Sequence, residues 1–151
     1  MAGELKVRPL GVRDRDEALR YLDCAPRLNL PLIDLVSKLG MPSSRGEGRT
    51  ELLAAFRGRE LAGVAALQPS MTLDAAVGCE ALEAFFPYLA GVGSGLVKSS
   101  EELVAPLWEW LRSQGRCSLL DRIETAYVLE ARHARMVDAG RYAPTGYNKQ
   151  P

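Results

Sequence analysis

Apolar residues recur along the chain with the periods of short strands and helices. Residues 5–10 alternate apolar and polar side chains, which predicts a short strand. Asp14 and Glu17 have the spacing of a capping box and predict the start of a helix. A second helix is expected from about Asn29, with apolar residues spaced along one face: Leu32, Leu35, Val36 and Leu39. Residues 41–50 have the composition of a loop.

The middle of the chain has the strongest β pattern. Residues 51–56 and 61–67 are apolar runs joined by a glycine-bearing connection of hairpin length, and residues 71–77 are expected to add a third strand. A helix is predicted after Gly78, because apolar residues again fall three and four positions apart: Leu82, Phe85, Phe86 and Leu89. The glycine-rich run 91–95 precedes a strand, so it is better interpreted as the end of this helix than as a phosphate loop.

The remaining pattern predicts a strand at 96–98, a helix at 101–113 introduced by Ser99 and Glu102, and two last strands at 116–120 and 124–131. From residue 132 the chain is polar. We therefore predict one α/β (α+β) domain over residues 1–131, with a mixed central sheet of six to seven strands flanked by about four helices. Residues 132–151 are interpreted as a polar tail or interdomain linker.

Charge and length narrow the classes of partner. The chain has 19 basic and 19 acidic residues, so we expect neither nucleic acid nor an anionic membrane as a partner. Its apolar runs fall well short of the ~20 residues that span a bilayer. No charged and apolar leader opens the sequence, and a cytoplasmic location is expected.

Cysteine and histidine usage predicts no metal site and no disulfide framework. Cys24, Cys79 and Cys117 lie far apart and form no paired motif, so we expect buried, reduced thiols. His133 is the only histidine, which leaves little material for a catalytic triad. It lies in a polar stretch and is expected to face solvent.

The order of the predicted elements resembles the GNAT (acetyl-CoA-dependent N-acyltransferase) fold over nearly all of residues 4–131. Short motifs more narrowly resemble the GNAT-like N-terminal domain of tandem GNAT proteins: Arg8-Pro9-Leu10, residues 26–30, Leu35 with Gly40, residues 56–63, and Arg122 with Tyr127-Val128-Leu129. In those proteins a second GNAT domain carries the acetyl transfer. The resemblance therefore implies a second GNAT domain, or a further copy of the chain, as a partner.

The chain departs from this family where the cofactor would bind. The family holds the pyrophosphate on an Arg/Gln-x-x-Gly-x-Gly/Ala loop after the fourth strand. This chain has Ala-Ala-Val-Gly-Cys-Glu at 75–80, so the cofactor-binding candidates Val77, Gly78 and Cys79 stand in a degenerate loop. Glu80 would place a negative charge near the phosphates, against the preference of a helix N-terminus for anions.

The catalytic set is also incomplete. The family often takes its general acid from a tyrosine on the helix after the fifth strand, and residues 101–113 contain none. Asp74 is the one candidate for a general base. A polar residue on the exposed side of a strand explains Asp74 equally well.

Three functions remain open, and with them whether the chain is an enzyme. The first is a non-catalytic N-terminal half that packs beside a catalytic acetyl-CoA-dependent domain and binds no cofactor. The second is a divergent but active small N-acetyltransferase that moves acetyl from acetyl-CoA to an amine, with acetyl-CoA or CoA as its cofactor and no metal. The third is a non-enzymatic interaction or regulatory module that uses helix 101–113 or the basic tail. The degenerate loop favours the first.

Overall fold

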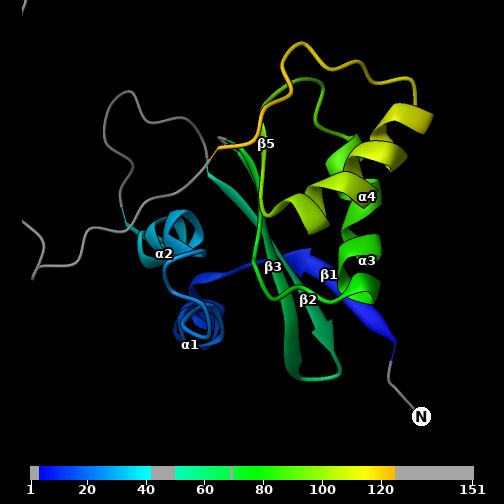
Figure 1. Cartoon of the computed structure of the whole chain (residues 1–151). Helices are drawn as coiled ribbons and strands as arrows, with labels where there is room; N and C mark the ends of the chain where they lie inside the picture. The colour runs from blue at the N-terminus through cyan, green and yellow to red at the C-terminus, as the bar shows by residue number, and fades with distance from the viewer. Residues whose placement is uncertain (1–3, 42–49, 69, 125–151) are drawn as a thin grey trace, which may run out of the picture. The chain divides into compact units, whose positions relative to one another are not determined.

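A computed structural model describes residues 4–41, 50–68 and 70–124 (Figure 1). The chain divides by its contacts into Met1–Leu120 and Asp121–Pro151, and every helix and strand below belongs to the first unit. The strands are β1 (Leu5–Pro9), β2 (Glu51–Arg57), β3 (Glu60–Gln68), β4 (Met71–Leu73) and β5 (Val97–Lys98). The helices are α1 (Arg15–Leu22), α2 (Leu30–Ser37), α3 (Cys79–Ala90) and α4 (Glu101–Ser113), with a short 3₁₀ helix η1 (Val12–Asp14) before α1.

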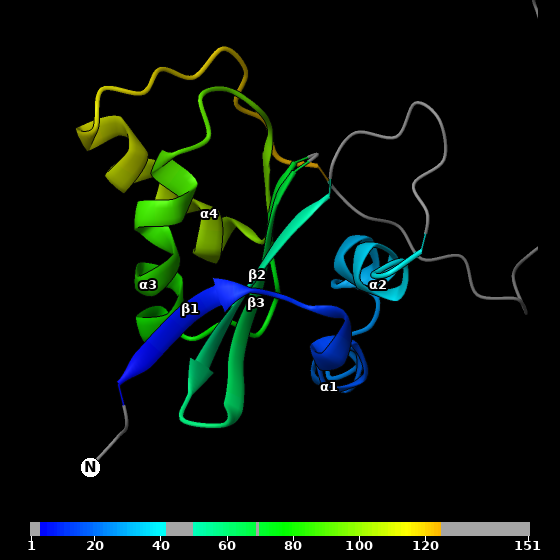
Figure 2. The ribbon, with the colours of Figure 1, turned by 180° about the vertical axis from the view of Figure 1, so that it is seen from behind.

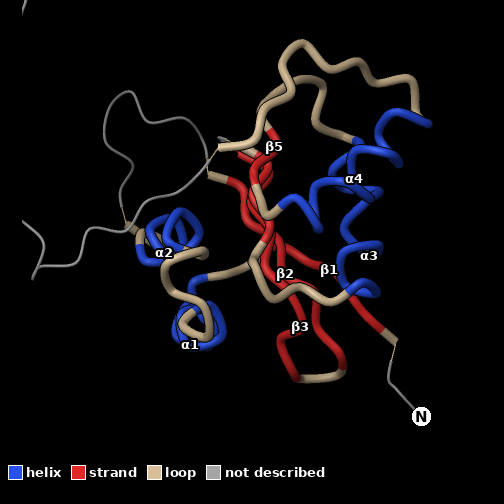
Figure 3. Tube along the Cα trace, viewed as in Figure 1, coloured by secondary structure: helices blue, strands red, loops and turns tan. Residues whose placement is uncertain are grey.

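The five strands form one mixed sheet in the order β1-β2-β3-β4-β5 (Figure 3). The strands β1 to β4 pair with one another in antiparallel fashion, and β5 pairs with β4 in parallel. The predicted hairpin is confirmed as β2 and β3, which turn at Gly58 with a φ of 64°, a conformation that favours glycine. The α/β class, the mixed sheet and the four α-helices are likewise confirmed within the described residues.

Helices cover both faces of this sheet (Figures 1 and 2). Side chains alternate along each strand, so successive residues of β2 face opposite layers. Leu53 and Ala55 join a buried cluster with residues of α3 and α4, whereas Leu52 and Ala54 join one with residues of α1 and α2. We call these the α3–α4 core and the α1–α2 core.

The number of strands predicted from the sequence is not confirmed, because the described residues contain five. Residues 116–120 are a loop, and Leu119 and Leu120 are exposed. The amide of Arg116 donates to the carbonyl of Leu111 in α4, which ties this segment to the helix end instead of to a strand. Of the predicted strand 124–131 only Glu124 is described, and it is not in a strand. The predicted domain boundary after residue 131 also lies outside the described residues.

Both predicted capping boxes are wrong in detail. The side chain of Asp14 does not cap α1, and it accepts a hydrogen bond from the amide of Gly11 at 2.9 Å instead. Ser100, not Ser99, is the N-cap residue of α4, and the hydroxyl of Ser99 donates to the carbonyl of Leu73 at 3.3 Å. In each case a nearby polar group competes for the side chain.

The thiols are exposed, contrary to their predicted burial. Cys24 follows the end of α1, Cys79 is the first residue of α3, and Cys117 lies beyond α4. Such positions at the ends of elements face solvent more than the middle of a helix or strand does. None of the described helices is long and apolar enough to cross a bilayer.

A charged clamp ties β1 to η1. The guanidinium of Arg8 donates two hydrogen bonds to the carboxylate of Asp14, at 2.7 and 2.8 Å, and lies over the ring of Phe56 at 4.2 Å from its centroid. The bonds from Arg8 lower the pKa of Asp14 to about 2. The clamp therefore keeps its charge well into the acidic range.

We expect Asp14→Asn to reduce the free energy of unfolding at pH 7 by about 1 kcal/mol, because Arg8 is half exposed and solvent weakens the pair. The pKa of Asp14 is lower in the folded protein than the ~3.9 of an unfolded chain. The stabilisation is thus complete above the unfolded pKa and is lost as the pH falls toward 2. Urea unfolding at pH 7 and pH 2.5 should show the difference between wild type and variant shrinking. The matched variant Asp16→Asn, at a more exposed carboxylate, should show little difference at either pH. An equal loss in both variants would contradict the clamp.

A close approach between β3 and α3 depends on Gly63. A Cβ atom at this position would lie 2.9 Å from Cγ2 of Val77 and 3.2 Å from Cε2 of Phe85. We expect Gly63→Ala to lower the free energy of unfolding by about 1–3 kcal/mol through overpacking. Gly93→Ala meets no atom within 4 Å and should be neutral or slightly stabilising. Denaturant unfolding of the two variants compares them directly, and equal stabilities would show that the core yields easily.

Candidate functional site

The loop between β4 and α3, residues 74–78, brings together the residues that the sequence singled out. Asp74, the predicted base, directly follows β4, and Gly78 is the N-cap residue of α3. Leu73 belongs to the α3–α4 core, so the alternation of side chains directs Asp74 to the α1–α2 face. There Asp74 has an exposed fraction of 0% and follows the end of β4, so its interpretation as a polar residue on the exposed side of a strand is wrong.

The carboxylate of Asp74 accepts three hydrogen bonds. Oδ2 accepts from the amide of Val64 at 2.7 Å, and Oδ1 accepts from the amide of Ala76 at 3.0 Å and from the hydroxyl of Tyr21 at 3.3 Å. Burial raises the pKa of Asp74, and these hydrogen bonds oppose that shift. A general base must come within hydrogen-bond reach of its substrate. The burial and the three donors favour a structural role, while the role of base stays a prediction.

Asn29 is a second buried polar residue that reaches this loop, with 1% of its surface exposed. Its Oδ1 accepts a hydrogen bond from the amide of Ala75 at 2.8 Å, and its Nδ2 donates to the carbonyl of Leu22 at 2.9 Å. The amide of Val77 donates to the backbone carbonyl of Asp74 at 3.5 Å. Three successive amides, at 75, 76 and 77, are thus engaged within the chain.

Tyr21 connects the loop to α1. Its hydroxyl lies 3.3 Å from Oδ1 of Asp74 and 3.2 Å from the carbonyl oxygen of Ala62, both of which can accept its hydrogen. Burial, and then the charge of Asp74, raise the pKa of Tyr21, so the phenol remains a donor over the ordinary pH range. Sequence reasoning missed Tyr21 and treated Asn29 only as a helix start. The one signal for Asn29 was an amide within an otherwise apolar stretch.

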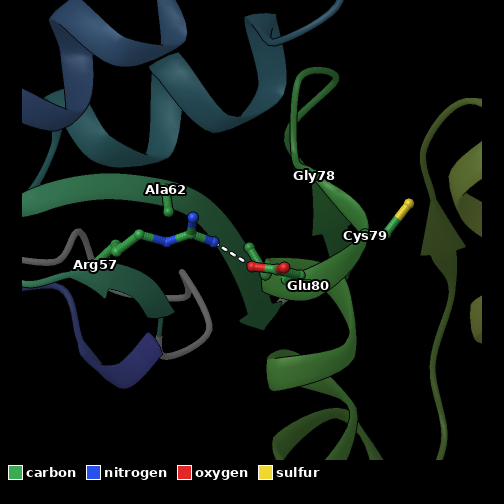
Figure 4. A pocket seen from close by; sticks show the side chains of 6 residues that line it. Arg57, Ala62, Gly78, Cys79 and Glu80 are labelled. Carbon is green, nitrogen blue, oxygen red and sulfur yellow. Dashed lines mark hydrogen bonds and ion pairs between the residues drawn. The ribbon is translucent and has the colours of Figure 1, made fainter. Parts of the chain in front are cut away.

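The three predicted cofactor-binding residues have different environments. Val77 is buried in the α3–α4 core. Gly78 and Cys79 line a shallow hollow of ≈ 310 Å³ at the start of α3, together with Arg57, Ala62, Glu80 and Ala81. Figure 4 shows the thiol of Cys79 pointing away from the side chains of Arg57 and Glu80. The structure therefore places two of the three residues at one surface.

An ion pair crosses the hollow. Arg57, at the end of β2, donates to the carboxylate of Glu80 in the first turn of α3 (Figure 4). A carboxylate is favourable at this position because the first turn of a helix carries partial positive charge. The Nε atom of Arg57 is buried and has no hydrogen-bond partner among the described residues. Glu80 thus supplies an anion to the helix N-terminus from within the chain.

Apolar side chains pack against β4 on the side of the sheet that carries α3 and α4. The parallel ladder pairs Met71 with Val97, and the hydroxyl of Ser99 extends the contact between the strands to the carbonyl of Leu73. Leu73 and Val77 share the α3–α4 core with Phe85 of α3 and Leu107 of α4, both 0% exposed. This part of the molecule is packed core.

The remaining candidates from the sequence are the glycine run 91–95, His133 and the basic tail. Gly91 directly follows α3, as predicted for a glycine run that ends a helix, and the guanidinium of Arg116 donates to the nearby carbonyl of Ala90 at 2.8 Å. His133 and the basic tail lie outside the described residues, and the described part of the chain holds no group of three or more His, Cys, Asp or Glu side chains placed for a metal ion.

We expect Asp74→Asn to lower the free energy of unfolding by about 1–3 kcal/mol. Both carboxylate oxygens accept from backbone amides, and an asparagine can accept through only one oxygen. Either the buried amide of Val64 or the part-buried amide of Ala76 would then lack its acceptor. Asp34→Asn, which removes an exposed carboxylate paired with Lys38, should change stability by under ~0.5 kcal/mol. Urea unfolding measures both, and a neutral Asp74→Asn would remove the structural role.

The site is therefore a buried polar cluster of Tyr21, Asn29 and Asp74 beneath a loop whose far end opens onto the Arg57–Glu80 hollow. The side chains of the cluster form hydrogen bonds with backbone groups. The hollow beside the loop is lined by the ion pair of Arg57 and Glu80. Comparisons of the chain with known protein families, with curated proteins and with solved structures returned no match.

Proposed function

We propose that this chain is a GNAT-like, non-catalytic N-terminal half, which packs beside a catalytic acetyl-CoA-dependent domain. The order of elements from β1 to α4 is the order that the resemblance predicts, and it supports the fold. One observation is the main support for the proposal that this chain does not bind the cofactor. The amides of Ala75, Ala76 and Val77 already donate hydrogen bonds to groups of the same chain.

A pyrophosphate-binding loop needs backbone amides that point at the ligand. Freeing Ala75 and Ala76 for a phosphate would leave the amide oxygen of Asn29 and one oxygen of Asp74 without those donors, although both side chains are buried. An unsatisfied buried group costs about 1–3 kcal/mol, which applies to Asn29, whereas Oδ1 of Asp74 would keep the hydroxyl of Tyr21. The internal hydrogen bonds therefore work against cofactor binding.

Two further features support this proposal. Glu80 places its carboxylate where a phosphate would benefit from the positive end of α3, and Arg57 is already paired with it. Leu73 of β4, Phe85 of α3 and Leu107 of α4 pack in one buried core, so a pantetheine arm that entered beside β4 on this face would have to displace them. The chain then contributes to activity through its position beside a partner domain.

We expect acetyl-CoA and CoA at millimolar concentration to leave the melting temperature of this chain unchanged. A ligand at 100 times its dissociation constant adds about 2.7 kcal/mol of stability, which corresponds to about 5–10 °C for a domain of this size. Thermal scans beside a catalytically active acetyltransferase as positive control make the measurement. A shift of that size in this chain would contradict the proposal and support the divergent, active N-acetyltransferase.

The partner half is tested on the full-length gene product. Hydrogen exchange with and without acetyl-CoA should show protection outside residues 1–131 and none at residues 75–80. A gene product that ends at residue 151, or protection at 75–80, would overturn the assignment as an N-terminal half.

A further inference from the structure

We propose that Tyr21, Asn29 and Asp74 form a polar latch that couples the α1–α2 helix pair to the N-terminus of α3 on the opposite side of the sheet. A change on either side of the sheet would then alter the stability of the other. This coupling concerns the fold itself and holds whether or not the chain binds a cofactor.

The latch joins segments that are distant in sequence. Tyr21 lies on α1, Asn29 lies in the connection between α1 and α2, and both reach the loop that follows β4. The Nδ2 atom of Asn29 also donates to the carbonyl of Leu22, the last residue of α1. One end of the latch is therefore fixed to both the end of α1 and the start of α2.

The loop of residues 74–78 contacts both faces of the sheet and so links the latch to the α3–α4 core. Its first residues, Asp74 and Ala75, are held from the α1–α2 side. Val77, three residues after Asp74, is buried in the α3–α4 core, where it lies against Gly63. Helix α3 begins two residues further on, at Cys79. So short a segment cannot shift at one end and keep its packing at the other.

A second connection runs through Ala62. Its carbonyl oxygen lies 3.2 Å from the hydroxyl of Tyr21 and shares with Asp74 the single hydrogen of that group, and Ala62 also lines the hollow with Arg57 and Glu80. Movement of α1 would thus reach the hollow through β3 as well as through the loop. By linkage, any group that orders the hollow would in turn stabilise the position of α1.

The polar groups of the latch are expected to open together. Asp74 and Asn29 are buried, so losing one partner leaves another without compensation in a place that solvent does not reach. Partial opening is therefore less favourable than a concerted one.

Tyr21→Phe tests the latch by removing one hydroxyl and keeping the ring. We expect amides in the segment 75–82 to exchange about two- to tenfold faster, the range that one net hydrogen bond gives. The matched control is Tyr88→Phe, which removes a hydroxyl of α3 that donates to the exposed carbonyl of Val7. Hydrogen exchange by mass spectrometry at constant pH reads both, with circular dichroism confirming that both variants fold. Equal exchange at 75–82 in the two variants would overturn the proposal.

The reverse direction is tested from the α3–α4 core. Val77→Ala and Leu107→Ala each truncate a buried side chain of that core, but only Val77 lies on the loop. We expect Val77→Ala to speed exchange at residues 18–29 more than Leu107→Ala does. Equal effects at 18–29 would mean general loosening and would refute coupling through the loop. If either variant fails to fold, the Tyr21→Phe comparison decides alone.

Discussion

Taking a carboxylate out of water is unfavourable unless hydrogen bonds replace its hydration, and the structure around Asp74 follows from that constraint. Three donors reach the carboxylate of Asp74: the amide of Val64 in β3, the amide of Ala76 in the loop after β4, and the hydroxyl of Tyr21 in α1. Its bond to Ala76 turns the chain soon after Leu73 and accounts for the short β4, three residues long where the pattern predicted seven. The direction in which the chain enters α3 is set by the same turn.

The same hydrogen bonds that stabilise the loop restrict its chemistry. A backbone amide that donates to Asn29 or Asp74 is not available to a phosphate, and a loop that kept those amides free would forgo their stabilisation. The proposed non-catalytic role thus agrees with a loop whose polar groups are satisfied from within the chain. A polar latch between two helical layers is a second consequence of that internal satisfaction.

The sequence patterns predicted features that depend on near neighbours, such as the β2–β3 hairpin and the apolar face of α3. They failed where a distant or competing partner decides. Residues 116–120 are apolar enough for a strand but pair with none of the described strands, and Asp14 binds Arg8 instead of capping α1. The site could be predicted only as a set of positions, because Tyr21 and Asp74 are 53 residues apart and no local pattern marks their contact.

Two departures from the GNAT pattern lie at the cofactor loop itself, the altered sequence of residues 75–80 and the charge of Glu80, and the free energies behind them differ. Glu80 is 72% exposed and Arg57 is 37% exposed, so solvent screens their ion pair and limits it to about 0–1 kcal/mol. Releasing the amides of Ala75 and Ala76 would leave the buried Oδ1 of Asn29 without a donor, at about 1–3 kcal/mol, and would leave Oδ1 of Asp74 with the hydroxyl of Tyr21 alone. The internal bonds of the loop therefore oppose an anionic ligand more strongly than the charge of Glu80 does. Removing that charge alone would leave the larger barrier in place.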